Sequence, residues 1–276
     1  MSTGASIDPR AFHDFEQAGW QKAAAYYSDT FGTLTAQAVE PLLDSLGVGA
    51  GVRLLDVATG PGYVAASASS RGALVVGIDF SPLMIDQARR DHPGLRFEPG
   101  DAEALSFDDE SSDVVAMNFG LLHLARPEAA IREAHRVLVS GGRYAFTVWA
   151  RPEEAVGFGV VLRAMEAFGR TDVGLPSGPP FFRFSDHEEC RRTLARIGFV
   201  DAQVEQLPLV WHLPSADDLF QAALFGGVRT SAALQAQTPE ALSEIRSAVH
   251  AALAPYANEK GLAIPMGVVL ASATKP

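Results

Sequence analysis

The sequence feature that most constrains the fold is a regular alternation of short apolar runs and helical stretches between Val52 and Trp149. Strands that alternate with helices at this spacing form βαβ units, which build a parallel sheet with helices on both faces. The continuous apolarity of the first runs indicates strands buried on both sides. The predicted strands are Arg53–Ala58, Ala73–Ile78, Leu95–Glu98, Asp113–Asn118 and Arg143–Trp149, and the predicted helices are Gly62–Ser70, Pro82–Asp91 and Pro127–Val139.

Helical segments flank this region. Residues 12–46 have a helical pattern that is broken near Gly32 and Pro41, and residues 1–11 are predicted to be a disordered tail. Ser185 and Glu188 form a capping-box pattern that opens a helix running to Arg196 and ending at Gly198. The other elements expected after Trp149 are a helix at Glu153–Phe168, a strand at Phe199–Val210, a helical insertion at Ser215–Tyr256 and a strand at Leu262–Ala273. The strand–insertion–strand order predicts an antiparallel pair at the edge of the sheet.

The composition excludes several classes of protein. The 22 Lys and Arg against 33 Asp and Glu give a formal net charge of -11, which argues against binding a nucleic-acid backbone. The chain has a single cysteine, Cys190, which cannot form an internal disulfide and favours a reducing compartment. No apolar run is long enough to span a membrane, and MSTGASIDPR is not typical of a signal peptide. We therefore expect a cytoplasmic protein.

The strongest chemical signal is the turn in LLDVATGPGYVA, where a buried strand ends at Asp56 and a helix follows at once. Gly60 and Gly62 allow backbone to approach a ligand closely, and the helix start offers unpaired N–H groups. A turn with two glycines is weak evidence by itself, because many tight turns carry them.

Two more acidic residues follow the next two predicted strands. Asp79 ends the second strand nineteen residues after Gly60, where an acid accepts the hydroxyls of a ribose. The alternative role, capping the next helix, suits Ser81 better because Ser81 directly precedes Pro82. Asp101 follows the third strand and therefore reaches the same edge of the sheet.

The turn leaves two types of ligand open. Gly60-x-Gly62-x-x-Ala65 is a relaxed dinucleotide fingerprint, which would indicate a nicotinamide-dependent oxidoreductase. Asp56 inside the turn would repel a pyrophosphate, whereas it would attract an ammonium or a sulfonium group. With Asp101 at the same edge, the acids favour a cationic nucleoside.

Five stretches in a fixed order resemble one family. They are LDVATGPG, VVGIDFSPLMIDQAR, GDAEALSFDDESSDVV, NFGLLHL and EAHRVLVSGGRYAFTVW. The chain resembles the class I S-adenosylmethionine-dependent methyltransferases, in the small-molecule branch similar to ubiquinone and menaquinone C-methyltransferases, strongly over Val52–Trp149 and weakly over RFSDHEECRRTLARIGF. The resemblance implies a Rossmann-like, seven-stranded, mostly parallel sheet with helices on both faces, an N-terminal helical lid and a helical insertion before the last strand.

The resemblance also implies a cofactor, S-adenosyl-L-methionine, and its product, S-adenosyl-L-homocysteine. In the family pattern, the turn lies under the methionine part, Asp79 holds the ribose and Asp101 accepts from the adenine amino group. The family often has glycine at the position of Ala58. The cofactor-binding residues implied are Tyr27 from the lid, Asp56, Ala58, Thr59, Gly60, Gly62, Asp79, Phe80, Met84, Asp101, Ala102, Asn118 and Phe119.

Residues for the acceptor side are weaker candidates. His123 follows the fourth strand and is the candidate general base, although a lone histidine often has only a structural role. His123, Tyr26, Trp149 and Trp211 are candidates for contact with the substrate, with core packing as the alternative for each aromatic residue. The spacing of His187, Glu188, Glu189 and Cys190 matches no metal-ligand set, so we predict no metal site.

These patterns predict one methyltransferase domain over residues 12–276, with a lid at 12–46, a cofactor-binding core at 52–150, and substrate-side insertions at 151–184 and 214–260. The predicted reaction is an SN2 methyl transfer from S-adenosylmethionine to a small organic acceptor. A nicotinamide-dependent oxidoreductase and a non-catalytic nucleoside-binding module are the alternatives. We expect a small-molecule substrate, no nucleic acid and no membrane span, and the oligomeric state is left open.

Overall fold

The structure, a computed structural model, describes residues 8–276. The chain divides into two compact units, and the single domain expected from the sequence stays a prediction. We call residues 35–149, 179–207 and 268–276 the sheet unit, and residues 8–34, 150–178 and 208–267 the helical unit. The division follows from the insertions and the N-terminal helix, which form a helical core of their own.

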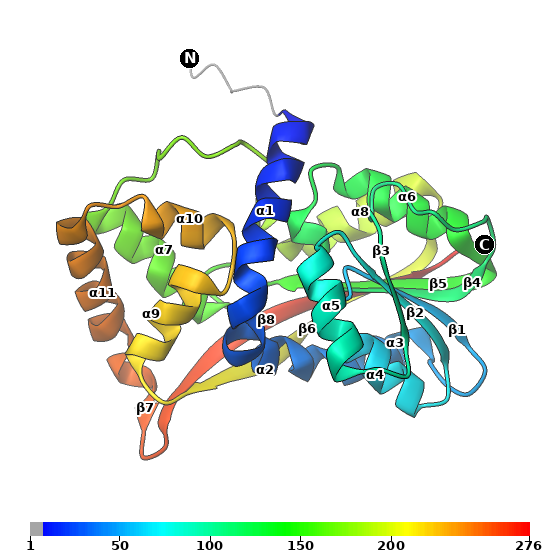
Figure 1. Cartoon of the computed structure of the whole chain (residues 1–276), viewed down its shortest axis with the longest axis horizontal. Helices are drawn as coiled ribbons and strands as arrows, with labels where there is room; N and C mark the ends of the chain where they lie inside the picture. The colour runs from blue at the N-terminus through cyan, green and yellow to red at the C-terminus, as the bar shows by residue number, and fades with distance from the viewer. Residues whose placement is uncertain (1–7) are drawn as a thin grey trace. The chain divides into compact units, whose positions relative to one another are not determined.

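The central sheet has the strand order β3-β2-β1-β4-β5-β8-β6, with a short β7 paired to β8 (Figure 1). β1 to β5 run parallel, and β8 is antiparallel to β5. β6 lies beside β8 at the sheet edge, and their predicted antiparallel direction stays a prediction. The sheet has eight strands, not seven, because the hairpin before β8 adds the two-residue β7. The strands are β1 Arg53–Val57, β2 Leu74–Asp79, β3 Arg96–Pro99, β4 Ser112–Asn118, β5 Leu138–Trp149, β6 Val200–Leu213, β7 Ala257–Asn258 and β8 Gly261–Thr274.

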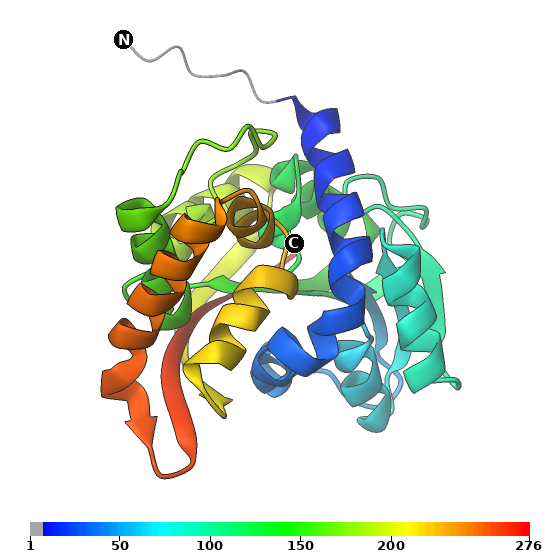
Figure 2. The ribbon, with the colours of Figure 1, turned by 60° about the vertical axis from the view of Figure 1, so that its left-hand side comes forward.

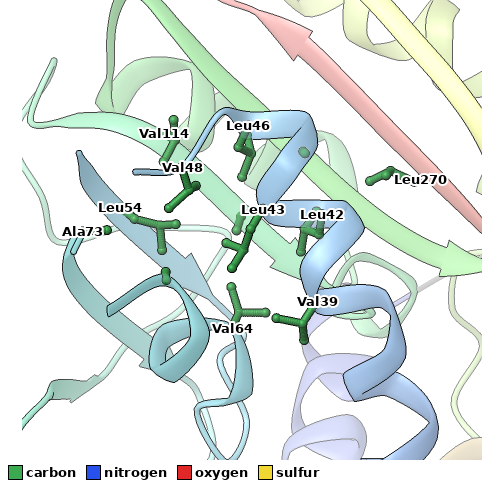
Figure 3. Close-up of a cluster of buried hydrophobic side chains, with 13 residues drawn as sticks. Val39, Leu42, Leu43, Leu46, Val48, Leu54, Val64, Ala73, Val114 and Leu270 are labelled. Carbon is green, nitrogen blue, oxygen red and sulfur yellow. The ribbon is translucent and has the colours of Figure 1, made fainter. Parts of the chain in front are cut away.

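One face of the sheet unit is covered by apolar helices, α3 (Val39–Leu46), α4 (Tyr63–Ser70) and α5 (Pro82–Asp91). Leu42, Leu43 and Leu46 of α3 are fully or almost fully buried, together with Val64 of α4 and Leu54 of β1 (Figure 3). Burying a leucine side chain contributes about 1.5–3 kcal/mol. This cluster therefore holds the strands whose ends carry the candidate site.

The opposite face carries α6 (Pro127–Val137) and α8 (His187–Ile197). Tyr144 and Phe146 of β5 are fully buried and contact the rings of Phe199 and Phe184. Ala145, between them in the strand, belongs to the α3 cluster, as the alternation of side chains along a strand requires. Both faces of the parallel strands are therefore covered, as the sequence predicts.

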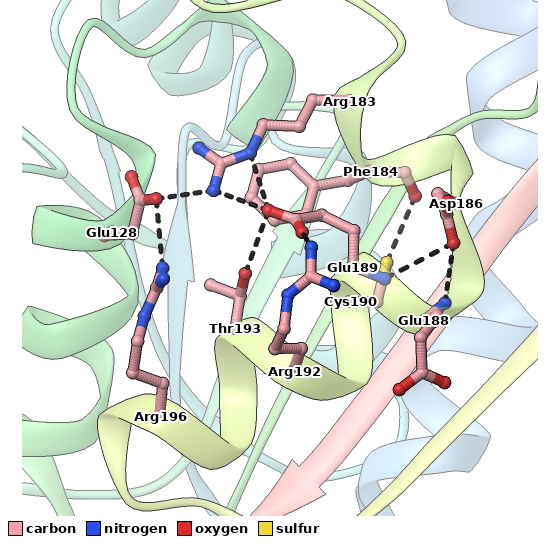
Figure 4. Close-up of polar contacts among 10 residues, drawn as sticks. All are labelled: Glu128, Arg183, Phe184, Asp186, Glu188, Glu189, Cys190, Arg192, Thr193 and Arg196. Carbon is pink, nitrogen blue, oxygen red and sulfur yellow. Dashed lines mark hydrogen bonds and ion pairs between the residues drawn. The ribbon is translucent and has the colours of Figure 1, made fainter.

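An ion-pair network joins α6 and α8 to the short helix η4 (Arg183–Ser185) (Figure 4). Arg183 donates to Glu128 of α6 and to Glu189 of α8, each at 2.6 Å. Glu189 also pairs with Arg192, and Glu128 with Arg196. The network fixes the loop that precedes α8.

The helical unit contains α1 (Pro9–Tyr27), α7 (Val156–Phe168), α9 (Ala216–Phe225), α10 (Arg229–Gln235) and α11 (Pro239–Leu253) (Figures 1 and 2). α1 packs against α9 and α10. α11 lies beside α7 and α9. A π-helical segment, η1 (Ser28–Gly32), continues α1. The remaining short helices are α2 Thr33–Thr35, η2 Ala36–Ala38, η3 Leu121–His123 and η5 Ala254–Tyr256.

Three local predictions are wrong. Asp186, not Ser185, caps α8, because the Asp186 carboxylate accepts from the N–H groups of Glu188 and Glu189 while the Ser185 hydroxyl donates to Phe182. Pro41 does not break the helix, since it lies in the first turn of α3, where no N–H is needed.

The start of the first helix also differs from the prediction. α1 begins at Pro9, behind its N-cap Asp8, so residues 9–11 belong to the helix and not to the tail. Residues 1–7 of the predicted tail lie outside the described residues.

Candidate functional site

The turn after β1 is organised by Asp56, which is fully buried. One oxygen of its carboxylate, Oδ2, accepts from the Thr59 hydroxyl at 2.5 Å and from the Ala65 N–H at 3.1 Å. The Ala65 N–H belongs to the first turn of α4 and is thereby satisfied by Asp56. In dinucleotide folds, N–H groups at this position of a helix bind a phosphate. The other oxygen of Asp56, Oδ1, is buried and has no hydrogen-bond partner among the described residues.

Asp79 ends β2 and is almost fully buried, at 6% exposure. Its Oδ2 accepts from the Gly60 N–H and its Oδ1 from the Ser81 N–H, both at 2.9 Å. Ser81 is the N-cap of α5, as predicted, and its hydroxyl accepts from the Met84 N–H. Each carboxylate oxygen of Asp79 keeps a second lone pair for a ligand.

Burial dominates the ionisation of both acids. Burial, with a smaller contribution from the charge of Asp79, raises the pKa of Asp56 to about 7 against the opposing hydrogen bonds from Thr59 and Ala65. Burial likewise raises the pKa of Asp79 to about 6, opposed by the N–H groups of Ser81 and Gly60. A positively charged or hydroxyl-bearing ligand would favour the ionised forms.

The backbone of the turn leaves room for a ligand. Gly60 has a φ of +54°, and a Cβ placed on it would meet no atom within 4 Å. Ala58 also lies in the left-handed region, at a φ of +57°, where glycine costs less than alanine. The position at which the family often has glycine is therefore one whose backbone conformation favours glycine.

The segment after β3 holds Asp101 and Ala102. The Asp101 carboxylate accepts from the Glu103 N–H at 2.8 Å, and Ala102 is buried. The buried Glu103 accepts from the backbone N–H and the Nε of Arg126, both at 2.7 Å. Sequence reasoning missed Glu103, which fixes the loop carrying Asp101, and no motif in the sequence marks it.

At the end of β4, Asn118 and Phe119 are tied to β5. The Asn118 Oδ1 accepts from the Thr147 hydroxyl at 2.6 Å, and its Nδ2 donates to the Thr35 carbonyl at 3.2 Å. The Phe119 ring lies against Trp149, with ring centroids 4.2 Å apart. Sequence analysis also missed Thr147, although a threonine among the apolar residues of a buried strand is a visible signal.

The remaining sheet-unit candidates occupy different settings. Met84 is buried in α5, and Phe80 is half-buried directly after β2. His123 is half-buried in η3 and makes an edge contact with the Phe181 ring, at a centroid distance of 5.9 Å. Trp149 is buried and lies against Phe119, and its role in contact with the substrate stays a prediction.

Three predicted residues belong to the helical unit. Tyr26 is 49% exposed and stacks on Phe225, while Tyr27 makes an edge contact with Trp20. Trp211 is buried beside Phe31, at a centroid distance of 4.8 Å. The roles of Tyr27 in cofactor binding and of Tyr26 and Trp211 in substrate binding stay predictions.

Among residues 8–276, no group of three or more His, Cys, Asp and Glu side chains is arranged to hold a metal ion. Over the same residues, no helix has the length and apolarity to cross a bilayer. The buried thiol of Cys190 donates to the Phe184 carbonyl, and burial raises its pKa to about 12, so it is not a nucleophile.

Comparison with known proteins identifies relatives. Residues 55–146 match the family model of a methyltransferase domain. A demethylmenaquinone methyltransferase of Renibacterium salmoninarum is 30% identical over 175 residues, which are 60% of this chain and 74% of that protein. A protein of the same name from Beutenbergia cavernae is 39% identical over 121 residues. This match covers 42% of this chain and 50% of that protein.

A solved structure has the same fold. It is a phosphoethanolamine N-methyltransferase of Haemonchus contortus in complex with S-adenosyl-L-methionine, with a TM-score of 0.59 at 19% identity. The match covers 96% of this chain and 60% of that one, and at this identity it shows the fold alone. Neither the oxidoreductase nor the non-catalytic module gains support from these relatives.

Proposed function

We propose, from the premise that this chain belongs to the family of S-adenosylmethionine-dependent methyltransferases, that the carboxyl edge of β1, β2 and β4 in its sheet unit holds the cofactor. The chain is an enzyme, and its reaction is methyl transfer with release of S-adenosylhomocysteine. Different residues of this chain bind the cofactor and take the proton of the acceptor.

One observation carries the proposal: two buried carboxylates, Asp56 and Asp79, lie at the glycine turn where a dinucleotide fold would bind phosphate. Asp56 already accepts the N–H of Ala65, and Asp79 accepts the N–H of Gly60. A pyrophosphate brought to this turn would meet negative charge in place of free donors. A nucleoside with a positive charge meets no such repulsion.

The residues present fit the cofactor. The open space beside Gly60 leaves room against the turn, and Asp79 offers two oxygens for ribose hydroxyls. Asp101 follows β3 at the same edge and would accept from the adenine amino group, beside the buried Ala102. The full proposed set is the sheet-unit part of the prediction, namely Asp56, Ala58, Thr59, Gly60, Gly62, Asp79, Phe80, Met84, Asp101, Ala102, Asn118 and Phe119.

Bound S-adenosylmethionine supplies a methyl group on a sulfonium, from which an in-line nucleophile displaces the neutral thioether. The protein's own task is to hold the reactants in line, which can lower a barrier by about 7–11 kcal/mol. Asp79 is fixed by two backbone N–H groups and so needs no reorganisation when it binds hydroxyls. Asn118 and Phe119, the proposed neighbours of the sulfonium, carry no charge that would oppose its loss of charge.

For the acceptor we propose a small organic molecule, with a demethylated quinol as the first compound to test because two relatives bear that activity in their names. His123 is the proposed base that takes the acceptor proton. Since the single cysteine, Cys190, is a free thiol, we propose a cytoplasmic location, which cell fractionation would test.

Calorimetric titration with S-adenosylhomocysteine and, separately, with NADH tests the cofactor. We expect binding of the thioether and none of NADH, and the reverse result would overturn the proposal. A tritiated-methyl assay over a panel of quinols, phenols and amines then identifies the acceptor. In that assay His123→Ala should lower turnover at unchanged cofactor affinity, and normal turnover would remove His123 from the chemistry.

A further inference from the structure

Thr147 is a polar side chain in an apolar stretch of β5. Its residue is fully buried, as are Ala145 and Phe146 before it, and Val148 after it is 1% exposed. A buried hydroxyl without a partner costs about 1–3 kcal/mol, so such a group needs a specific contact. Valine has nearly the same shape and would fill the position without that requirement.

The Thr147 hydroxyl makes two hydrogen bonds, both to the end of β4. It donates to the Asn118 Oδ1 at 2.6 Å and accepts from the Phe119 N–H at 3.0 Å. Asn118 and Thr147 lie opposite each other in the parallel pairing of β4 and β5. The same Phe119 N–H also reaches the Thr147 carbonyl, at 3.2 Å, so the strand contact does not depend on the hydroxyl alone.

These contacts fix the orientation of the Asn118 amide. Its Nδ2 donates to the Thr35 carbonyl, so its Oδ1 must face a donor, and the Thr147 hydroxyl is that donor. With one N–H and one lone pair used, the amide still has a second N–H and a second lone pair. Both remaining groups are therefore held in a defined direction.

The hydroxyl also supports an uncommon backbone conformation. Phe119 has a φ of +56°, in the left-handed region that side chains other than glycine seldom adopt. The Phe119 N–H is held by Thr147, and the ring is held by Trp149 at a centroid distance of 4.2 Å. Thr147 thus acts on both residues that we place beside the sulfonium.

We propose that Thr147 is a positioning residue of the methyl-transfer site, which orients the Asn118 amide and the Phe119 backbone for the cofactor. This inference rests on the proposed function. Thr147 acts through its two neighbours and does not contact the reactants. Removing only the Thr147 hydroxyl should therefore reduce cofactor affinity more than removing a buried hydroxyl elsewhere in the sheet unit.

The test compares Thr147→Val with Thr147→Ser. Losing one or two oriented contacts should weaken S-adenosylhomocysteine binding about tenfold in Thr147→Val, whereas Thr147→Ser should restore it to within about twofold. Thr193→Val is the matched control, because Thr193 is a buried threonine of α8 whose hydroxyl contacts Glu189. It should lower the melting temperature without changing the affinity.

A second readout separates positioning from stability. The side-chain amide signals of Asn118, assigned by their loss in Asn118→Asp, should shift in the nitrogen–proton spectrum of Thr147→Val and return in Thr147→Ser. In an Asn118→Ala background, Thr147→Val should weaken binding clearly less than tenfold, because only its contact with the Phe119 N–H is still lost and coupled residues are not additive.

Equal affinities for the wild type and Thr147→Val, or additive effects in the double variant, would overturn the role of Thr147. Absence of thioether binding to the wild type would instead overturn the proposed function. The two failures are therefore distinguished by the first titration.

Discussion

The buried acids of the candidate site and of the helical unit are held in different ways, whereas the buried Glu103 elsewhere in the sheet unit pairs with Arg126. In the sheet unit, Asp56 and Asp79 are neutralised by no cation and accept from hydroxyl and backbone N–H groups of the adjoining turns. In the helical unit, the fully buried Glu16 pairs with Arg229 at 2.8 Å, and Arg229 lies over the Phe12 ring. Acids held only by dipoles have a raised pKa and gain from a cationic or hydroxyl-bearing ligand, whereas an acid paired with arginine is already neutralised.

The family model covers part of one unit only. The methyltransferase family model matches residues 55–146, all of which lie within the sheet unit. No residue of the helical unit falls within that match. The family model therefore covers most of the predicted cofactor-binding core, and the predicted substrate-side insertions at 151–184 and 214–260 lie outside it.

The largest effect is expected in the helical unit. Glu16→Gln removes one partner of a buried ion pair and should lower the free energy of unfolding by about 3 kcal/mol. The affinity of the folded protein for S-adenosylhomocysteine should not change. Chemical denaturation and calorimetry measure the two quantities.

Glu40→Gln is the control for that variant, since Glu40 is 63% exposed in its pair with Arg71 and should contribute less than about 1 kcal/mol. If Glu16→Gln weakened cofactor binding as strongly as a sheet-unit variant, the contrast between the units would be wrong.

The second effect belongs to the sheet unit. Asp79→Asn removes the charge that we assign to the ribose and should weaken S-adenosylhomocysteine binding about a hundredfold, since hydrogen bonds to charged groups contribute about 1.5–3 kcal/mol each. Asp113→Asn is the matched control, because Asp113 forms a partly exposed pair with Arg53. Similar affinities for the two variants would remove Asp79 from the site.

A smaller effect is expected at the turn. Gly60→Ala places a Cβ in the open space beside the backbone and adds about 1–2 kcal/mol of strain at a φ of +54°. We expect cofactor affinity about tenfold lower. Gly94→Ala is the control, since a Cβ there also meets no atom within 4 Å and its φ is not in the left-handed region. Unchanged affinity in Gly60→Ala would show that no ligand uses this space.

The smallest effect is a pH dependence. Ribose hydroxyls favour the ionised form of Asp79, so affinity should rise by up to about tenfold as pH increases from 5 to 7 and binding should release protons near pH 6. Calorimetry in buffers of different ionisation enthalpy measures this release, which should decrease in Asp79→Asn.

The stability of the ligand-free protein should move in the opposite direction. Because the pKa of Asp56 and of Asp79 is raised on folding, the folded state binds more protons than the unfolded state between about pH 4 and pH 7. This contribution to stability is present below pH 4 and is lost as pH rises through 6 and 7. The melting temperature measures this loss. If Asp56 and Asp79 instead made the protein more stable as pH rises from 4 to 7, their raised pKa values would be wrong.

Much of the fold could be predicted because local patterns and burial agree. The helix Pro82–Asp91 was predicted with the observed bounds, since Ser81 and Pro82 mark its start. The cap of α8 could not be predicted, because Ser185 and Asp186 are adjacent and both are good caps. The local turn of η4 decides between them, because the Ser185 hydroxyl donates to the Phe182 carbonyl three residues earlier.

For the candidate site, the sequence by itself determined the turn and its acids, because strand ends and glycines are local features. From these features we predict that Asp56, Gly60 and Asp79 lie at one edge of the sheet. Only the folded chain brings the Asp79 carboxylate to the Gly60 N–H and the Thr147 hydroxyl to Asn118, and divides the chain into two units. These features depend on residues that are distant along the chain or on neighbouring strands, and a periodic pattern does not encode which partner a hydroxyl or a carboxylate meets.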